Sequence, residues 1–172
     1  SAAVQSSVGR SSPDRERGSP SSVLPTRCVR VAFLPSDPSR FVVGDDLGHI
    51  LHHSRYSYGV PTPRSFDTLH EHLAAAVSAI SFSHKHPGYF IGARTDGSLA
   101  LYHVNDGRPL LSFGGFATGG IVQTAWATTR PAMFWVLDGA DNMHVFDLLQ
   151  DMAKPILTTH LQPSRTAEST AN

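Results

Sequence analysis

Residues 124–148 read TAWATTRPAMFWVLDGADNMHVFDL and contain one complete cycle of a pattern that recurs along the chain. An apolar segment ending at Trp126 leads into a turn that contains Pro131. Two further apolar runs follow, separated by a turn at Asp141-Asn142. Because proline fixes φ and cannot donate a backbone hydrogen bond, it ends the first strand. The stretch therefore predicts three β-strands joined by short turns.

Two earlier copies of this pattern precede it. Five residues of the first copy recur 49 residues later, and six of the second recur 44 residues later. The three sets are Phe33, Pro38, Phe41, Gly48, Ile50; then Phe82, Pro87, Phe90, Gly97, Leu99 with Leu101 and Tyr102; then Trp126, Pro131, Phe134, Met143, Val145, Phe146. Such periods lie near the roughly 40–45 residues of four-stranded propeller blades. The sequence therefore predicts an all-β chain of about three propeller blades, an incomplete ring.

Each copy also predicts strands by itself, because apolar residues alternate with others in the first segments. The Asp-Gly and Asn-containing turns accept the positive φ that a two-residue hairpin needs. The expected strands are 28–34, 77–82 and 121–127 (first), 40–45, 89–94 and 133–138 (second), 49–54, 98–103 and 143–148 (third), and 109–113 and 156–161 (fourth). The only candidate helix, 69–76, is too short to be stable alone.

The predicted domains are three blades, about 25–68, 72–115 and 118–161, between two polar tails. Residues 1–24 and 162–172 are rich in Ser, Pro, Thr and Arg and contain few apolar residues. Such segments cannot bury enough surface to offset the entropy lost on ordering, so we expect both to be disordered.

Composition excludes several classes of function. The net charge is zero with His neutral, which gives no basic field for nucleic acid. A single cysteine, Cys28, excludes a disulfide framework and favours a reducing compartment. No apolar run approaches the ~20 residues of a membrane span, and the first residues lack a signal peptide's apolar core. We expect a soluble intracellular protein with no membrane insertion.

Phe146-Asp147 ends the third strand of the last copy, and Tyr102-His103 and His53-Ser54 hold the same place in the others. This resembles the Trp-Asp dipeptide that closes WD40 repeats. Such repeats often link a His, an Asp and the Trp by hydrogen bonds. The resemblance implies that His72, Asp96 and Tyr102 take these places.

A second resemblance rests on 124–151 (TAWATTRPAMFWVLDGADNMHVFDLLQD) and 40–60 (RFVVGDDLGHILHHSRYSYGV). Both resemble the dynein intermediate chains, above all those of cytoplasmic dynein-2, over about residues 28–155. This implies a non-catalytic scaffold that binds the dynein heavy chain and other dynein subunits for retrograde intraflagellar transport. The implied location is the cytoplasm, cytoskeleton and cilium. That family has a long N-terminal region that binds light chains, which cannot be transferred to the ~25 residues that precede the first blade here.

Two other functions stay open. The chain is alternatively a WD40 adaptor of another assembly, such as a ubiquitin-ligase receptor or a trafficking complex. A propeller hydrolase would need converging carboxylates or a Ser/His/Asp set, whereas the aspartates here fit turns. The ten histidines have no thiol or carboxylate at matching spacing, and Cys28 is in register with apolar residues. We therefore expect no enzyme, no cofactor and no metal.

The segment HHSRYSYG (52–59) is the candidate partner-binding site. It offers Arg55, Tyr56 and Tyr58, and such residues are enriched at interface hot spots. The alternative is that the tyrosines pack on a neighbouring blade.

The register gives two expectations about burial. Phe33, Phe82 and Trp126 are expected to be buried at equivalent positions, as are Ile50, Leu99 and Met143. Three blades form an open arc, so its end faces are expected to bind the remaining blades of the full-length chain or to associate. The residues expected on these bare faces are Val29, Val42 and Ile50 at one end and Ile121, Val136 and Val145 at the other.

Overall fold

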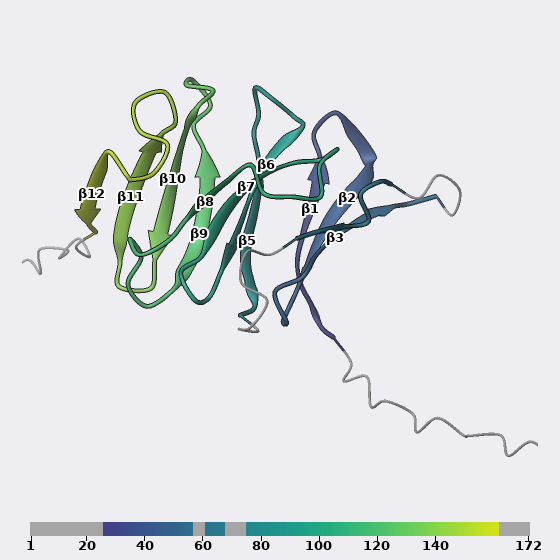
Figure 1. Ribbon diagram of the computed structural model, residues 1–172, viewed down its shortest axis with the longest axis horizontal. Coiled ribbons are helices and arrows are strands. Elements are labelled where there is room, and N and C mark those ends of the chain that lie inside the picture. The colour runs from purple at the N-terminus through teal and green to yellow at the C-terminus, as the bar shows by residue number, and fades with distance from the viewer. Residues whose placement is uncertain (1–25, 57–60, 68–74, 162–172) are drawn as a thin grey trace, which may run out of the picture.

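The computed structural model describes residues 26–56, 61–67 and 75–161, and all regular elements in these ranges are strands (Figure 1). They form three antiparallel sheets of four strands each. Blade 1 contains β1 (Cys28–Leu34), β2 (Asp37–Asp45), β3 (Ile50–Ser54) and β4 (Ser65–Phe66). Blade 2 contains β5 (Val77–Phe82), β6 (Tyr89–Arg94), β7 (Leu99–His103) and β8 (Leu111–Phe113). Blade 3 contains β9 (Ile121–Trp126), β10 (Met133–Asp138), β11 (Asn142–Asp147) and β12 (Leu157–His160).

Within each sheet the strands follow one another in chain order. The blades lie side by side in Figure 1, from blade 1 on the right to blade 3 on the left. The first strands are the contact line between blades, because β5 packs against both β1 and β9. The three sheets thus form an open arc of propeller blades, and the all-β fold class predicted from the sequence is confirmed.

The predicted strands match the observed ones within a few residues, with two differences. The sequence did not predict β4, which contains only two residues. Strand β2 begins at Asp37 and so includes Pro38, which was expected in a turn. The candidate helix 69–76 falls almost entirely outside the described residues, as do the tails 1–24 and 162–172. The domain boundaries therefore stay predictions.

Each turn between the second and third strands contains one residue of positive φ at the same place in the repeat. These are Gly48 (φ 90°), Gly97 (φ 88°) and Asp141 (φ 60°). In blades 1 and 3 an aspartate at the end of the second strand stabilises the turn. Asp45 accepts hydrogen bonds from the backbone of Leu47 and His49, and Asp138 accepts them from Ala140 and Asn142. The tight turns predicted from the sequence are confirmed.

The core consists of two layers of side chains, one between blades 1 and 2 and one between blades 2 and 3. Phe82 and Trp126 are buried in these layers as predicted. Phe33 is 55% exposed, so the prediction of its burial was wrong. Its register is nevertheless equivalent, since Phe33, Phe82 and Trp126 pair with Phe41, Phe90 and Phe134 respectively. Phe33 is exposed because it points away from blade 2.

The second set of predicted core positions and the predicted bare faces also need correction. Ile50 and Leu99 are buried, but Met143 is only half-buried. Of the residues expected on bare faces, Val42, Ile50, Ile121 and Val136 are at most 2% exposed. Strand alternation turns these four toward a neighbouring blade, and Val29 and Val145 are half-buried.

Among the described residues no helix is of a length and hydrophobicity suited to crossing a membrane.

Candidate functional site

Blades 2 and 3 each carry a row of three rings across the first three strands, on the face turned toward the preceding blade. In blade 2 the row is Phe82, Phe90 and Tyr102, with ring centroids 5.1 and 5.2 Å apart. In blade 3 it is Trp126, Phe134 and Phe146, at 5.4 and 4.9 Å. The second and third rings of each row stack at 17° and 9°. Offset or edge-on aromatic pairs at such distances add about 0.5–1.5 kcal/mol beyond area burial.

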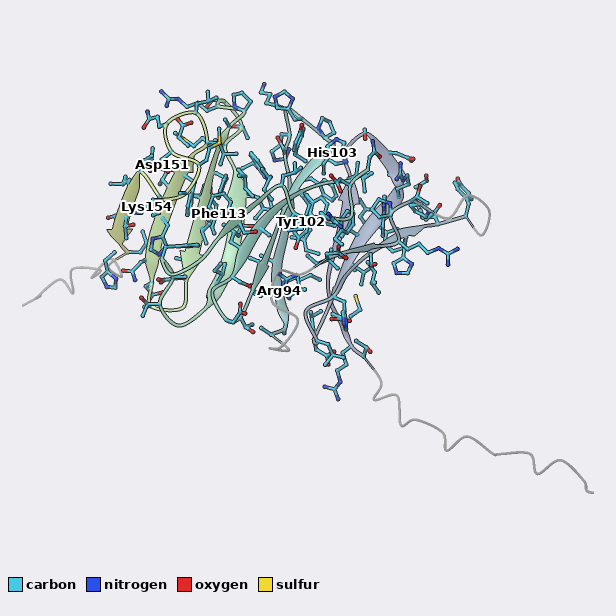
Figure 2. The ribbon with its side chains drawn as sticks, viewed as in Figure 1. Arg94, Tyr102, His103, Phe113, Asp151 and Lys154 are labelled. Carbon is cyan, nitrogen blue, oxygen red and sulfur yellow. The ribbon has the colours of Figure 1, made fainter. Side chains whose placement is uncertain are left out.

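The preceding blade covers each of these two rows with a phenylalanine from its fourth strand. Phe66 of β4 packs edge-on against Phe90 at 4.9 Å, and Phe113 of β8 against Phe146 at 5.1 Å. Figure 2 labels Tyr102 and Phe113 in these layers. Hydrogen bonds to the preceding blade fix the rows further. The Tyr102 hydroxyl donates to the carbonyl oxygen of Asp67, beside β4, at 3.0 Å. The Trp126 Nε1–H donates to the carbonyl oxygen of Ser81 at 3.0 Å.

Blade 1 repeats this row, but no described residue covers it. Phe33, Phe41 and His53 have ring centroids 5.7 Å apart, and Phe41 and His53 stack at 22°. A second cross-strand row lies on the same face, formed by Val31, Val43 and Leu51. Val31 and Phe33 are more than half exposed. We call these six residues the leading face of the arc.

The opposite end of the arc is also apolar. Ala125, Trp135, Val145 and Leu157 face one another across the four strands of blade 3, and Leu137 pairs with Met143 beside them. All six are half-buried or exposed, whereas the residues of blade 2 equivalent to Trp135 and Leu137, namely Ile91 and Ala93, have no exposed surface. We call this the trailing face. Both faces have the composition of an interior layer.

The structure describes two of the three residues predicted to contact a partner, Arg55 and Tyr56. Arg55 and Tyr56 follow β3 and are exposed, Tyr56 at 57%. The backbone of Arg55 donates to the carbonyl of Ser39 at 2.8 Å, which fixes the chain beside β2. Tyr58 lies outside the described residues. Because Arg55 and Tyr56 come two and three residues after His53, the predicted site adjoins the leading face, and its role in partner contact stays a prediction.

One polar cluster contains the groups that a hydrolase would use, but it lacks access to a substrate. The His144 ring lies 3.2 Å from Asp138 and 3.0 Å from the Thr158 hydroxyl. Both His144 and Asp138 are buried, and Phe116 packs edge-on against the imidazole at 5.1 Å. Burial alone would raise the pKa of Asp138, but hydrogen bonds from Thr118, Asn142 and His144 hold it well below its usual range. The cluster is a buried anion fixed by donors, and it stabilises the turn between β10 and β11.

The link expected between Asp96 and Tyr102 is wrong. Asp96 is exposed in its turn and accepts a hydrogen bond from the backbone of Ser98, while the Tyr102 hydroxyl donates to Asp67. His72, the third member, lies outside the described residues. Within the described ranges no three His, Cys, Asp or Glu side chains come together as a metal site would require.

The repeat of four-stranded sheets, with its equivalent turns and aromatic rows, defines a segment of a WD40-type β-propeller. No family model matches the chain. It is 34% identical over 142 residues to the mouse cytoplasmic dynein 2 intermediate chain 1, and 32% identical over 141 residues to its human counterpart, in both cases over 81% of this chain. It is 28% identical over 137 residues, 74% of this chain, to the mouse cytoplasmic dynein 2 intermediate chain 2. The chain is therefore homologous to the WD40-repeat dynein intermediate chains, and it spans only 13–14% of the length of the first two relatives and 25% of the third.

Proposed function

We propose that this chain is a non-catalytic part of a dynein-2 intermediate chain, whose propeller binds the dynein heavy chain in retrograde intraflagellar transport. The homology over 81% of the chain is the observation that carries this proposal. The location that follows is the cytoskeleton of the cytoplasm and cilium. The exposed segment at Arg55 and Tyr56 is the surface we propose for contact with another dynein subunit.

The two open faces support a second partner, namely further blades of the same full-length polypeptide. The leading face repeats the aromatic row that is covered in blades 2 and 3, and exposed apolar patches of this kind rarely persist on a monomer. Propellers protect their sheets by repeating blades around a ring of about four to eight. A blade on each face would bury these rows in the way that blades 1 and 2 bury those that follow them.

Co-expression of the full-length protein with the tail of a dynein-2 heavy chain tests the main proposal. We expect the two to elute together in size-exclusion chromatography. Exchange of Arg55 for Glu together with Tyr56→Ser should weaken the complex at least tenfold if this segment is the contact. The matched control is Arg108→Glu, an exposed arginine of blade 2. Separate elution of the unsubstituted proteins would refute the heavy-chain assignment.

A further inference from the structure

A cleft of about 330 Å³ opens between blades 2 and 3. Most of its lining residues belong to the β5–β6, β9–β10 and β11–β12 connections, which lie at the same edge of the arc in Figure 1. Its walls are largely apolar and include Tyr89, Leu101, Trp126, Pro131, Leu148 and Leu149. Leu149 is 83% exposed and Tyr89 39% exposed at the rim. A cleft of this size accommodates one or two large apolar side chains or a small ligand.

The side chains at the edge of this cleft differ from those at the equivalent positions between blades 1 and 2. Between blades 1 and 2 the position equivalent to Ser83 holds Leu34, which is buried at 2% exposure. The position equivalent to Leu148 holds Val104, which is also buried, whereas Leu148 is only half-buried. The small Ser83 side chain therefore leaves open, between blades 2 and 3, the space that Leu34 fills one blade earlier.

The loops that line the cleft expose positive charge. Lys85 lies at the tip of the β5–β6 connection between His84 and His86, and Lys154 lies in the loop after β11, labelled in Figure 2. Neither lysine takes part in a salt bridge with a described residue.

The two carboxylates at these loops, Asp147 and Asp151, accept hydrogen bonds from nearby backbone N–H groups. Asp147 is buried, lies 3.6 Å from Arg130 and accepts the backbone N–H of Leu149. Asp151 accepts the backbone N–H groups of Ala153 and Lys154, and these bonds lower its pKa, so it stays ionised and engaged with its own loop. Asp151 is exposed and carries its negative charge near Lys154, whereas the β5–β6 connection contains Lys85 and no carboxylate, so the exposed charge of that connection is positive.

We propose that this cleft binds an acidic, amphipathic segment of a partner protein. An apolar side chain of that segment enters between Trp126 and Leu149, and its carboxylates lie near Lys85 and Lys154. Amphipathic helices commonly bind hydrophobic grooves in this way, and complementary charge sets their orientation and rate of binding. The inference does not depend on the heavy chain being the partner.

The test uses full-length protein and two synthetic 18-residue peptides. Each has leucines on one helical face, and the other face carries glutamates in one peptide and lysines in its counterpart. We expect fluorescence anisotropy to show at least tenfold tighter binding of the glutamate peptide. Leu149→Gln, which removes apolar surface without changing charge, should weaken that binding at least tenfold. The combined exchange K85E/K154E should reverse the preference between the peptides.

The matched control is Leu110→Gln, another exposed leucine of the same blades that does not line the cleft. It should leave the affinity unchanged, and thermal melting should show that all variants fold. Equal binding of the two peptides, undetectable binding of the glutamate peptide, or full affinity in Leu149→Gln would overturn the proposal.

Discussion

The stability lost in Phe33→Ala distinguishes a covered leading face from a bare one. Phe33 and Phe82 occupy the same place in the repeat, so the loss can be compared with that of Phe82→Ala. Phe82 is 7% exposed and Phe33 is 55% exposed. Replacing a buried phenylalanine by alanine costs about 3–5 kcal/mol, from lost burial and the cavity that remains. In residues 1–172 alone, where Phe33 is more than half exposed, the cost should be about 1 kcal/mol or less. In the full-length protein a preceding blade should raise it to about 3–5 kcal/mol.

Hydrogen exchange of the backbone amides shared by β1 and β2 is the suitable assay, because a multi-blade protein need not unfold in two states. A loss of about 3 kcal/mol should accelerate that exchange more than a hundredfold. Phe82→Ala is the control and should cost about 3–5 kcal/mol in both the short and the full-length protein. If Phe33→Ala costs less than about 1 kcal/mol in the full-length protein while Phe82→Ala costs the expected amount, the leading face is bare and the reasoning fails.

Three further predictions concern single side chains. Burial, and secondarily the Arg40 charge, lower the pKa of His52 to about 4, and neither ring nitrogen has a partner among the described residues. The stability that its neutral form provides is complete above the unfolded pKa near 6.5 and is lost as pH falls toward 4. His52→Leu should therefore raise the free energy of unfolding by about 1 kcal/mol at pH 7. It should also make the urea midpoint depend less on pH between 6.5 and 4, and an unchanged dependence of the midpoint on pH would contradict this. The pKa of Asp138 is depressed, so its contribution to stability should be present above the unfolded value of 3.8 and be lost as the pH falls below it. Asp138→Asn should therefore make the loss of stability in acid less steep in the same urea titrations. An equally steep loss in the variant would show that other groups cause it. Gly97→Ala should cost about 1–2 kcal/mol of stability for its positive φ alone. Gly48→Ala should cost more, because a Cβ there would lie 2.6 Å from the Ala75 carbonyl oxygen. Equal losses of stability for the two variants in thermal melts would mean that this contact relaxes.

The sequence predicted the strands and turns because these depend on local chemistry. Alternation across 29–33 and proline and glycine at repeated positions have their effect within a few residues, and the observed β1, β5 and β9 agree closely with the predicted first strands. The repeat also predicted the register correctly, including the equivalence of Phe33, Phe82 and Trp126. Strand β4 was missed because two residues carry no periodicity.

Burial was harder to predict, because alternation tells which residues share a face but not whether anything covers it. The error at Phe33 and the reversed assignment of Val42 and Ile50 both come from this limit. One signal was present in the sequence: residues 133–137 are apolar at every position, which is typical of a strand covered on both faces. Trp135 and Leu137 could have been assigned to the trailing face from it. The cleft could not be predicted, since it depends on how Ser83 and Leu148 meet across two blades.

The side chains of the two open faces also bear on which blade could cover them. Phe66 and Phe113 occupy the same place in blades 1 and 2, where they pair with Ile50 and Leu99 and cover the following aromatic row. In blade 3 the residue that pairs with Met143 is Thr159. A second copy of this chain placed on the leading face would set Thr159, and not a phenylalanine, over Phe33, Phe41 and His53. Because a threonine buries less apolar surface and brings a hydroxyl that needs a partner, that contact would be weaker than either interior one. The leading face is therefore better suited to a blade of different sequence, with an aromatic or large apolar residue in its fourth strand, than to self-association of these three blades.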